Sequence, residues 1–321
     1  MKTILRIALI VIAVGILSTL FFLPISDQVP ETPKVKIVTT IFPAYDFTRT
    51  ISKDANVDIK LLIKPGADLH SYEPTPQDII DIKESDIFIY NGGESESWIK
   101  DILKELNTDT TIVRMMDSVE LKTESSKNLI NEDDKKESQD EVEYDEHVWT
   151  TPNNVIKISE AISQAIKNHS PDDTSIIQRN LDQFKTDLKT LDNDFHNLSS
   201  TKTGLLIVAD RFPFQYFVDE YGFDYIAAYP GCAEQTEASA KTVAELVKRT
   251  KQNPEKIVFR LELSNGKIAQ TVAKSAKAKV LTWHSVHNIS QADFDSGKTY
   301  LDFMRENLKN LDEALHDRSA S

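Results

Sequence analysis

The chain has 321 residues, of which 40% are hydrophobic and 27% are charged, and its formal net charge at pH 7 is −14. One hydrophobic core seldom serves much more than ~250–300 residues, so two domains are expected. The negative charge disfavours nonspecific binding to nucleic acid and suits attraction of cations, although acidity by itself usually indicates a solvated surface. Cys232 is the single cysteine. An intramolecular disulfide is therefore excluded, and metal ligands are expected from His, Asp and Glu.

Residues 1–30 are predicted to be an export signal or a membrane anchor. Lys2 and Arg6 precede an uncharged apolar stretch over residues 7–25, which is typical of such segments. Its length approaches the ~20 residues that cross a bilayer, and no small-x-small cleavage pattern follows it, so an uncleaved anchor and a cleaved signal both stay open. The positive charges keep its start in the cytoplasm, and the rest of the chain is expected outside, at the cell surface or in the periplasm. No cysteine follows the apolar stretch, so lipid attachment there is excluded.

Residues 31–170 are predicted to form an N-terminal α/β lobe. Short apolar runs alternate with amphipathic segments, a pattern that indicates parallel strands with crossover helices. The expected strands are 35–41, 57–63, 86–91 and 111–117, and the expected helices are 77–84, 97–106 and 154–168.

Residues 123–146 interrupt this pattern with ten acidic side chains. They show almost no apolar periodicity, so we predict a mobile surface insertion that packs against little. A solvated loop and a weak collector of cations are both open interpretations, and the composition favours the loop.

Residues 171–200 are predicted to form one helix that links the N-terminal lobe to a C-terminal lobe over residues 201–321. A helix of about 27 residues is roughly 40 Å long, enough to run along two small lobes. A short two-helix coiled coil is the weaker alternative, because fewer than four heptads are present. The apolar stripe of this helix is Ile177, Leu181, Phe184, Leu188, Leu191, Phe195 and Leu198.

The C-terminal lobe repeats the α/β rhythm. Its expected strands are 204–210, 223–229, 256–261 and 279–284, and its expected helices are 214–221, 240–251, 267–277 and 300–316. The predicted fold class is therefore α/β, with two lobes that are each a mainly parallel sheet flanked by helices, joined by one long backbone helix.

Three histidines stand in predicted loops or at strand ends, where open α/β sheets bind ligands. His70 follows the second strand and lies between proline-containing turns, His147 follows two carboxylates, and His284 ends a strand of the second lobe. Neighbouring carboxylates can orient a ligating imidazole. We therefore predict that these imidazoles converge on one metal ion.

Several motifs carry a resemblance to a known family. They are KPGADLHSYEPTP at 64–76, YNGG at 90–93 with Glu96 and Trp98, EHVW at 146–149 with Pro152, and Phe214, Tyr216, Phe217 and Tyr221-Gly222 in the C-terminal lobe. Over residues 35–315 the chain resembles the zinc and manganese solute-binding proteins of ABC importers. The resemblance implies a monomer, not an enzyme, that captures a divalent metal between two lobes and passes it to a membrane permease and its ATPase subunits.

The resemblance also implies a ligand set. His70 and His147 match the two ligands of the N-terminal lobe, and His284 falls where the family commonly has Asp or Glu. The fourth ligand aligns with Arg211, whose guanidinium has no electron pair to donate. Asp210 is the predicted substitute, although an ion pair with Arg211 or a helix cap is an equally ordinary role for it. Glu262, His287 and water stay open.

Three imidazoles with one carboxylate or water favour Zn²⁺ over Mn²⁺ as the transported ion, because manganese prefers oxygen ligands. Cys232 is interpreted as a small buried side chain and not as a ligand. An exported zinc hydrolase is the alternative function, but no His-Glu-x-x-His or Gly-x-Ser-x-Gly motif is present to support it. A surface adhesin is a third class, which the fold alone does not exclude.

Overall fold

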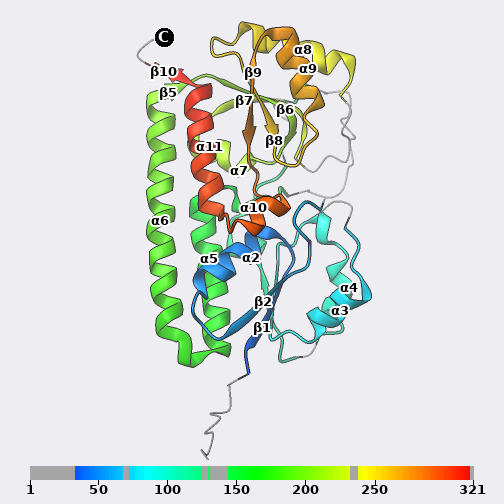
Figure 1. Ribbon diagram of the computed structural model, residues 1–321, viewed down its shortest axis with the longest axis vertical. Helices are drawn as coiled ribbons and strands as arrows, with labels where there is room; N and C mark the ends of the chain where they lie inside the picture. The colour runs from blue at the N-terminus through cyan, green and yellow to red at the C-terminus, as the bar shows by residue number, and fades with distance from the viewer. Residues whose placement is uncertain are drawn as a thin grey trace, which may run out of the picture. The chain divides into compact units, whose positions relative to one another are not determined.

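Two four-stranded parallel sheets form the framework of residues 34–321 (Figure 1). This computed structural model describes residues 33–67, 72–106, 108–124, 129–130, 144–231 and 238–318. The predicted export segment at 1–30 lies outside the described residues. Within the described part of the chain, no helix combines the length and the apolar character needed to cross a membrane.

The N-terminal sheet has the strand order β2-β1-β3-β4. Its strands are β1 (Val35–Thr39), β2 (Val57–Leu61), β3 (Ile87–Tyr90) and β4 (Thr111–Arg114), and every pairing is parallel. Each lies inside a predicted strand. All four residues of β3 are buried, as expected for a central strand covered by helices on both faces.

Helices cover both faces of the N-terminal sheet. One face packs on α3 (Pro76–Lys83) and α4 (Ile99–Leu103) through a cluster that includes Phe88, Ile82 and Ile99. The other faces α2 (Phe42–Ile51) and α5 (Pro152–His169). Helix α2 is not among the predicted elements, because its short apolar run continues directly from β1. Short 3₁₀ turns complete the lobe at Glu94–Glu96, Met115–Ser118, Val148–Thr150 and Pro171–Asp173.

The C-terminal sheet has the order β7-β6-β8-β9 and is also parallel. Its strands are β6 (Leu205–Phe212), β7 (Asp224–Pro230), β8 (Ile257–Leu261) and β9 (Lys279–Trp283). Its helices are α7 (Gln215–Tyr221), α8 (Ala240–Gln252), α9 (Lys267–Ala276), α10 (Gln291–Asp295) and α11 (Tyr300–Ala314), and a small antiparallel ladder joins β5 (Lys202–Thr203) to β10 (His316–Asp317). Helix α10 is not among the predicted elements.

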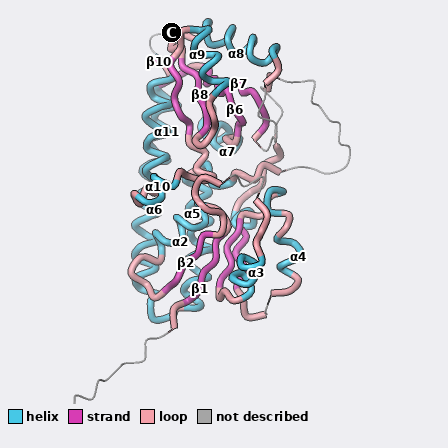
Figure 2. The backbone as a smooth tube through the Cα atoms, turned by 45° about the vertical axis from the view of Figure 1, so that its right-hand side comes forward, coloured by secondary structure: helices cyan, strands magenta, loops and turns pink. Residues whose placement is uncertain are grey.

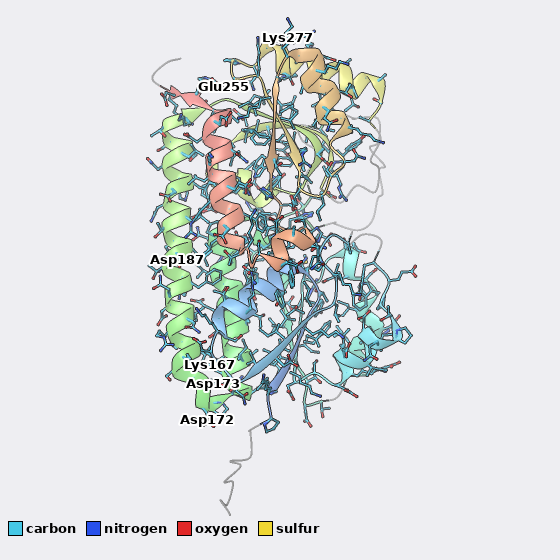
Figure 3. All side chains as sticks on the ribbon, in the orientation of Figure 1. Lys167, Asp172, Asp173, Asp187, Glu255 and Lys277 are labelled. Carbon is cyan, nitrogen blue, oxygen red and sulfur yellow. The ribbon has the colours of Figure 1, made fainter. Side chains whose placement is uncertain are left out.

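Helix α6 (Thr174–Thr201) is a single helix of 28 residues. Its buried residues are the seven that the apolar stripe predicts, which confirms the long backbone helix. It contacts α2 and α5 of the N-terminal lobe and α11 of the C-terminal lobe, and Figure 2 shows it running beside both sheets. In Figure 3, Asp173 at its start and Glu255, close to its far end, mark opposite ends of the two-lobe unit.

The acidic insertion packs more closely than its composition predicts. Leu129 forms a parallel bridge with Ala227 of β7, and the Ile130 amide donates to the Ala227 carbonyl at 3.2 Å. Asp145 and Glu146 are each only 3% exposed. The expectation that this segment packs against little is therefore wrong for these residues; residues 125–128 and 131–143 lie outside the described part.

Candidate metal site between the two lobes

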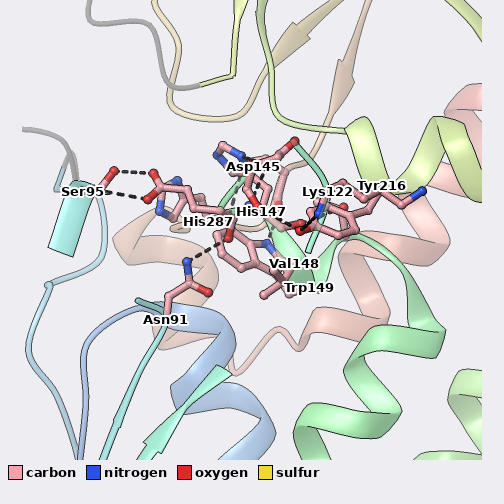
Figure 4. A network of polar contacts seen from close by, with 12 residues as sticks. Asn91, Ser95, Lys122, Asp145, His147, Val148, Trp149, Tyr216 and His287 are labelled. Carbon is pink, nitrogen blue, oxygen red and sulfur yellow. Dashed lines mark hydrogen bonds and ion pairs between the residues drawn. The ribbon is translucent and has the colours of Figure 1, made fainter. Parts of the chain in front are cut away.

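His147 is held by a carboxylate two residues before it. It immediately precedes the turn Val148–Thr150 and is 1% exposed. Its Nδ1 lies 2.8 Å from Asp145 Oδ1, and its backbone amide donates to the same oxygen at 2.8 Å (Figure 4). The carboxylate fixes the tautomer that carries the proton on Nδ1, which leaves the Nε2 electron pair available to a metal.

Charge around His147 also favours its protonated form. Burial is the strongest influence and lowers the pKa of His147, but the charge and hydrogen bond of Asp145, with smaller contributions from Glu146 and Glu124, outweigh it and raise the pKa above its usual value. Protons therefore compete with a metal for Nε2 as the pH falls.

The YNGG motif supports this loop from the neighbouring strand. The Asn91 amide donates to the Glu146 carbonyl at 2.8 Å, and Ser95 donates to the Glu146 carboxylate through its hydroxyl and its backbone amide (Figure 4). A Cβ on Gly93 would lie 1.7 Å from Glu146 Oε2, so only glycine permits this approach. The motif acts by positioning the loop before His147.

The opposite wall of the site comes from the loop after β9. The His287 ring lies 5.5 Å from the His147 ring, centroid to centroid, at 87°, and 5.1 Å from the Trp149 ring. Both imidazoles line one cavity of about 140 Å³, together with Ala67, Arg211, Glu262 and Asn288. The cavity thus brings together side chains from both lobes.

Hydrogen bonds join the loop that contains His70 to the C-terminal lobe. The Asn288 amide donates to the carbonyls of Lys64 at 2.9 Å and Ala67 at 2.7 Å, and the Gly66 amide donates to Ile289 at 2.8 Å. His70 itself lies outside the described residues, as does Cys232. Their sequence neighbours Ala67 and Gly231 line the cavity.

His284 does not line the cavity that His147 and His287 share. Its ring lines a second cavity of about 200 Å³, packs 5.0 Å from Phe303 and has Nε2 3.4 Å from Glu306 Oε1. Val286, which is 1% exposed, separates the two histidines with φ +59°, a left-handed conformation that β-branched residues rarely adopt. His284 and His287 line neighbouring cavities, which share Glu262, Leu263 and Asn288 in their walls.

Asp210 has a structural role in the C-terminal sheet. Its two carboxylate oxygens accept hydrogen bonds from the backbone amides of Arg211, at 3.0 Å, and Leu261, at 3.2 Å. The β6–β7 register shifts between Val208 and Arg211, and Asp210 satisfies amide groups next to this irregularity. It does not line the cavity, whereas Glu262 does, with its carboxylate accepting from the Ser285 amide and hydroxyl at 2.8 and 2.6 Å. The sequence-based prediction named Glu262 and His287 only as alternatives to Asp210 for the fourth ligand.

A separate surface cluster consists of Asp192, His196 and Glu220, the one group of three potential ligands within 4.8 Å of one another that the described residues contain. His196 is 49% exposed. Asp192 Oδ1 accepts from Tyr221 and Asn153, and the Asn153 amide also contacts Glu220. We interpret it as a solvated ion-pair cluster between α6 and α7.

Comparison with known proteins places the chain in a family. The family described as "Zinc-uptake complex component A periplasmic" matches residues 37–314. The high-affinity zinc uptake system protein ZnuA of Bacillus subtilis is 29% identical over 283 residues, covering 88% of each chain. The zinc-binding protein AdcA of Streptococcus pyogenes is 29% identical over 296 residues, which are 89% of this chain but 57% of AdcA. The chain thus spans little more than half the length of that relative.

A solved structure has the same architecture. The Zn(II)-bound ZnuA-like domain of Streptococcus pneumoniae AdcA is 25% identical and matches with a TM-score of 0.70, covering 88% of this chain and 98% of that domain. The predicted α/β fold with two lobes is confirmed. Because the family match spans most of the sequence, this protein belongs to the family of periplasmic zinc-uptake complex component A.

Proposed function

We propose that this protein is the extracytoplasmic solute-binding protein of an ABC metal importer, which captures one zinc ion between its lobes and delivers it to a membrane permease. The observation that carries this proposal is the cavity in which His147, oriented by Asp145, faces His287. The names of the relatives, zinc-binding protein and zinc uptake system protein, support the choice of ion.

The proposed zinc ligands are His147 and His287 from the described residues and His70 from the sequence resemblance. Glu262 is the nearest candidate for a carboxylate ligand, because it lines the same cavity. We leave His284 and Asp210 out of this set, because neither lines the cavity that His147 and His287 share. A set dominated by imidazole favours zinc over manganese.

The remaining parts of the proposal concern partners and location. A permease with its ATPase subunits is the proposed receiver of zinc, and the protein is proposed to act as a monomer without catalytic residues. Residues 1–30 are proposed to direct export, as a cleaved signal or as an anchor to the plasma membrane. The proposed lobes are 31–170 and 201–321, with 171–200 as the linking helix.

Calorimetric titration of the full chain tests the site. One zinc per chain should bind, and His147→Ala and His287→Ala should each weaken binding by about 100-fold or more, because each removes a direct ligand. His284→Ala is the matched control and should stay within a few-fold of wild type. If His284→Ala weakens zinc binding as much as His147→Ala does, while His287→Ala binds zinc as tightly as wild type, the ligand set predicted from the sequence would be restored. Tighter binding of manganese than zinc would rule out the zinc assignment.

Asp145→Asn tests how His147 is prepared for the metal. An amide oxygen still accepts from the ring and the backbone amide but lacks the negative charge, so zinc affinity should fall by about 10–100-fold. The measurement is the same titration, accompanied by a thermal melt of the metal-free variant. Unchanged zinc affinity would mean that Asp145 only shapes the loop.

A further inference from the structure

Ser285 stands between the side chains that line the proposed zinc site. It lies in the loop after β9, is 5% exposed and lines the same cavity as His147, Glu262 and His287. A serine can form hydrogen bonds through its amide, its carbonyl and its hydroxyl. Ser285 uses all three groups on residues of this site or next to it.

The amide and the hydroxyl of Ser285 both hold Glu262. They donate to the two carboxylate oxygens of Glu262, at 2.8 and 2.6 Å. A carboxylate has about four acceptor positions, so Ser285 occupies part of them and leaves others for a metal. Hydrogen bonds of this kind fix the orientation of a ligating side chain, and Glu262 already lines the cavity.

The same hydroxyl also fixes the backbone of His287. The His287 amide donates to Ser285 Oγ at 3.3 Å, a serine turn in which Val286 has φ +59°. On the other side, the Ser285 carbonyl accepts from the Trp149 indole at 2.8 Å, and Trp149 comes two residues after His147. Ser285 thus links the loop after β9 to the turn that follows His147.

Two strained backbone positions flank the contact between Ser285 and Glu262. Leu263 follows Glu262 with φ +57°, and the Ser264 amide reaches back to the Glu262 carbonyl at 2.6 Å. Val286 follows Ser285 and is also left-handed. Such conformations cost free energy in residues other than glycine and persist only where surrounding contacts hold them. The hydrogen bonds between Ser285 and Glu262 join the two strained turns to each other.

We propose that Ser285 is a positioning residue of the zinc site, which holds the Glu262 carboxylate as a zinc ligand and fixes the backbone of His287 beside it. This inference rests on the proposed function and deepens it by assigning Glu262 as a ligand that acts together with Ser285. A carboxylate that is already held in place loses less rotational freedom when zinc binds. Zinc affinity should therefore depend on the Ser285 hydroxyl, and it should do so through Glu262.

Calorimetric zinc titrations of the full chain test this with Ser285→Ala, which removes the hydroxyl and keeps the amide. Zinc affinity should fall by about 10–100-fold, the usual effect of losing a residue that orients a ligand. Ser285→Thr keeps the hydroxyl and should bind zinc within a few-fold of wild type. Ser52→Ala is the matched control, because Ser52 is 3% exposed and its hydroxyl donates to the Thr48 carbonyl in α2. This control should lower the melting temperature without changing zinc affinity.

A double-mutant cycle with Glu262→Ala separates positioning from a general loss of stability. Once the carboxylate is gone, Ser285→Ala should weaken zinc binding by a few-fold at most, because it no longer has that ligand to orient. A role in folding alone would give the same loss in both backgrounds. Thermal melts of the metal-free variants accompany the titrations. If Ser285→Ala does not fold, Ser285→Val takes its place and is compared with Ser285→Thr, which has nearly the same shape and keeps the hydroxyl.

The outcomes separate this inference from the proposed function. Zinc affinity equal to wild type in Ser285→Ala or in Glu262→Ala overturns the positioning proposal and leaves zinc capture standing. An equal loss from Ser285→Ala with and without the Glu262 carboxylate does the same. Absence of zinc binding in the wild-type protein overturns the proposed function and the positioning proposal with it.

Discussion

At the scale of single residues, Glu96 shows how the loop beneath the site depends on pH. It is 2% exposed, and its carboxylate accepts from the Gly92 amide at 2.7 Å. Burial raises the pKa of Glu96 from 4.5 to about 7, and the nearby charge of Glu146 adds to this against opposing hydrogen bonds. The folded protein therefore keeps a proton that the unfolded chain releases near pH 4.5, so this group lowers stability as the pH rises from about 4.5 to 7.

Glu96→Gln should remove that pH dependence, because the amide is neutral at every pH and has nearly the same shape. Relative to wild type, the variant should gain up to about 3 kcal/mol between pH 4.5 and pH 8, the energy that corresponds to the shift in pKa. Urea unfolding of both metal-free proteins at the two pH values measures it. Glu105→Gln, at a side chain that is 66% exposed, is the control. If the difference in free energy of unfolding between Glu96→Gln and wild type were the same at both pH values, the expectation would be wrong.

At the scale of elements, a buried carboxylate joins helix α2 to the start of helix α11. Asp46 is 1% exposed; its Oδ2 accepts from the Tyr300 amide at 2.7 Å, and its Oδ1 pairs with Arg49 at 2.6 Å. Tyr300 is the first residue of α11, and its hydroxyl donates to the Trp149 carbonyl at 2.9 Å. A helix start has unpaired amides and a partial positive charge, and Asp46 compensates both.

Asp46→Ala should lower the free energy of unfolding by about 2–3 kcal/mol, because the buried Tyr300 amide loses its acceptor and Arg49 loses its carboxylate partner. Asp302→Ala removes the exposed carboxylate that forms a capping box with Thr299 at the start of the same helix and should cost about 1 kcal/mol. Chemical denaturation of the three proteins gives both values. If both variants lost the same small amount of stability, Asp46 would not be the residue that joins α2 to α11.

At the scale of the whole molecule, the two sheets share one hydrophobic core. A single buried cluster includes Ile37 of the N-terminal sheet, Leu188 of α6 and Phe259 of the C-terminal sheet. The Trp149 indole donates across the lobes to the Ser285 carbonyl at 2.8 Å. The lobes are therefore held together by their own packing and hydrogen bonds.

We expect residues 34–321 to unfold in one cooperative transition. Scanning calorimetry should give a calorimetric enthalpy equal to the van't Hoff enthalpy. Leu188→Ala should keep that single transition and cost about 2–5 kcal/mol, because Leu188 is fully buried. Lys189→Ala, on the exposed side of α6, should change stability little. Two resolved transitions would show that the lobes unfold independently.

The sequence by itself determined the elements whose signals are local. The apolar stripe of α6 predicted seven buried residues correctly because helical periodicity is contained in one segment. The strands of both sheets followed from short apolar runs, and Asp145 beside His147 could be read directly from adjacent residues. Helices α2 and α10 were not predicted: the apolar run of α2 continues directly from β1, and α10 has only five residues, too few for a periodic pattern.

Only the tertiary structure decided which side chains share the cavity. His284 and His287 are three residues apart, and their separation depends on the buried left-handed turn at Val286 and on contacts of His284 with Phe303 and Asn307 of α11. Local preference disfavours such a turn at valine, so packing of distant elements imposes it. The contact of the Asp210 carboxylate with the Leu261 amide of β8 likewise joins residues about fifty positions apart, which no local pattern indicates. The chain specifies its helices and strands locally, but the site depends on pairings between residues far apart in sequence, which no local pattern records.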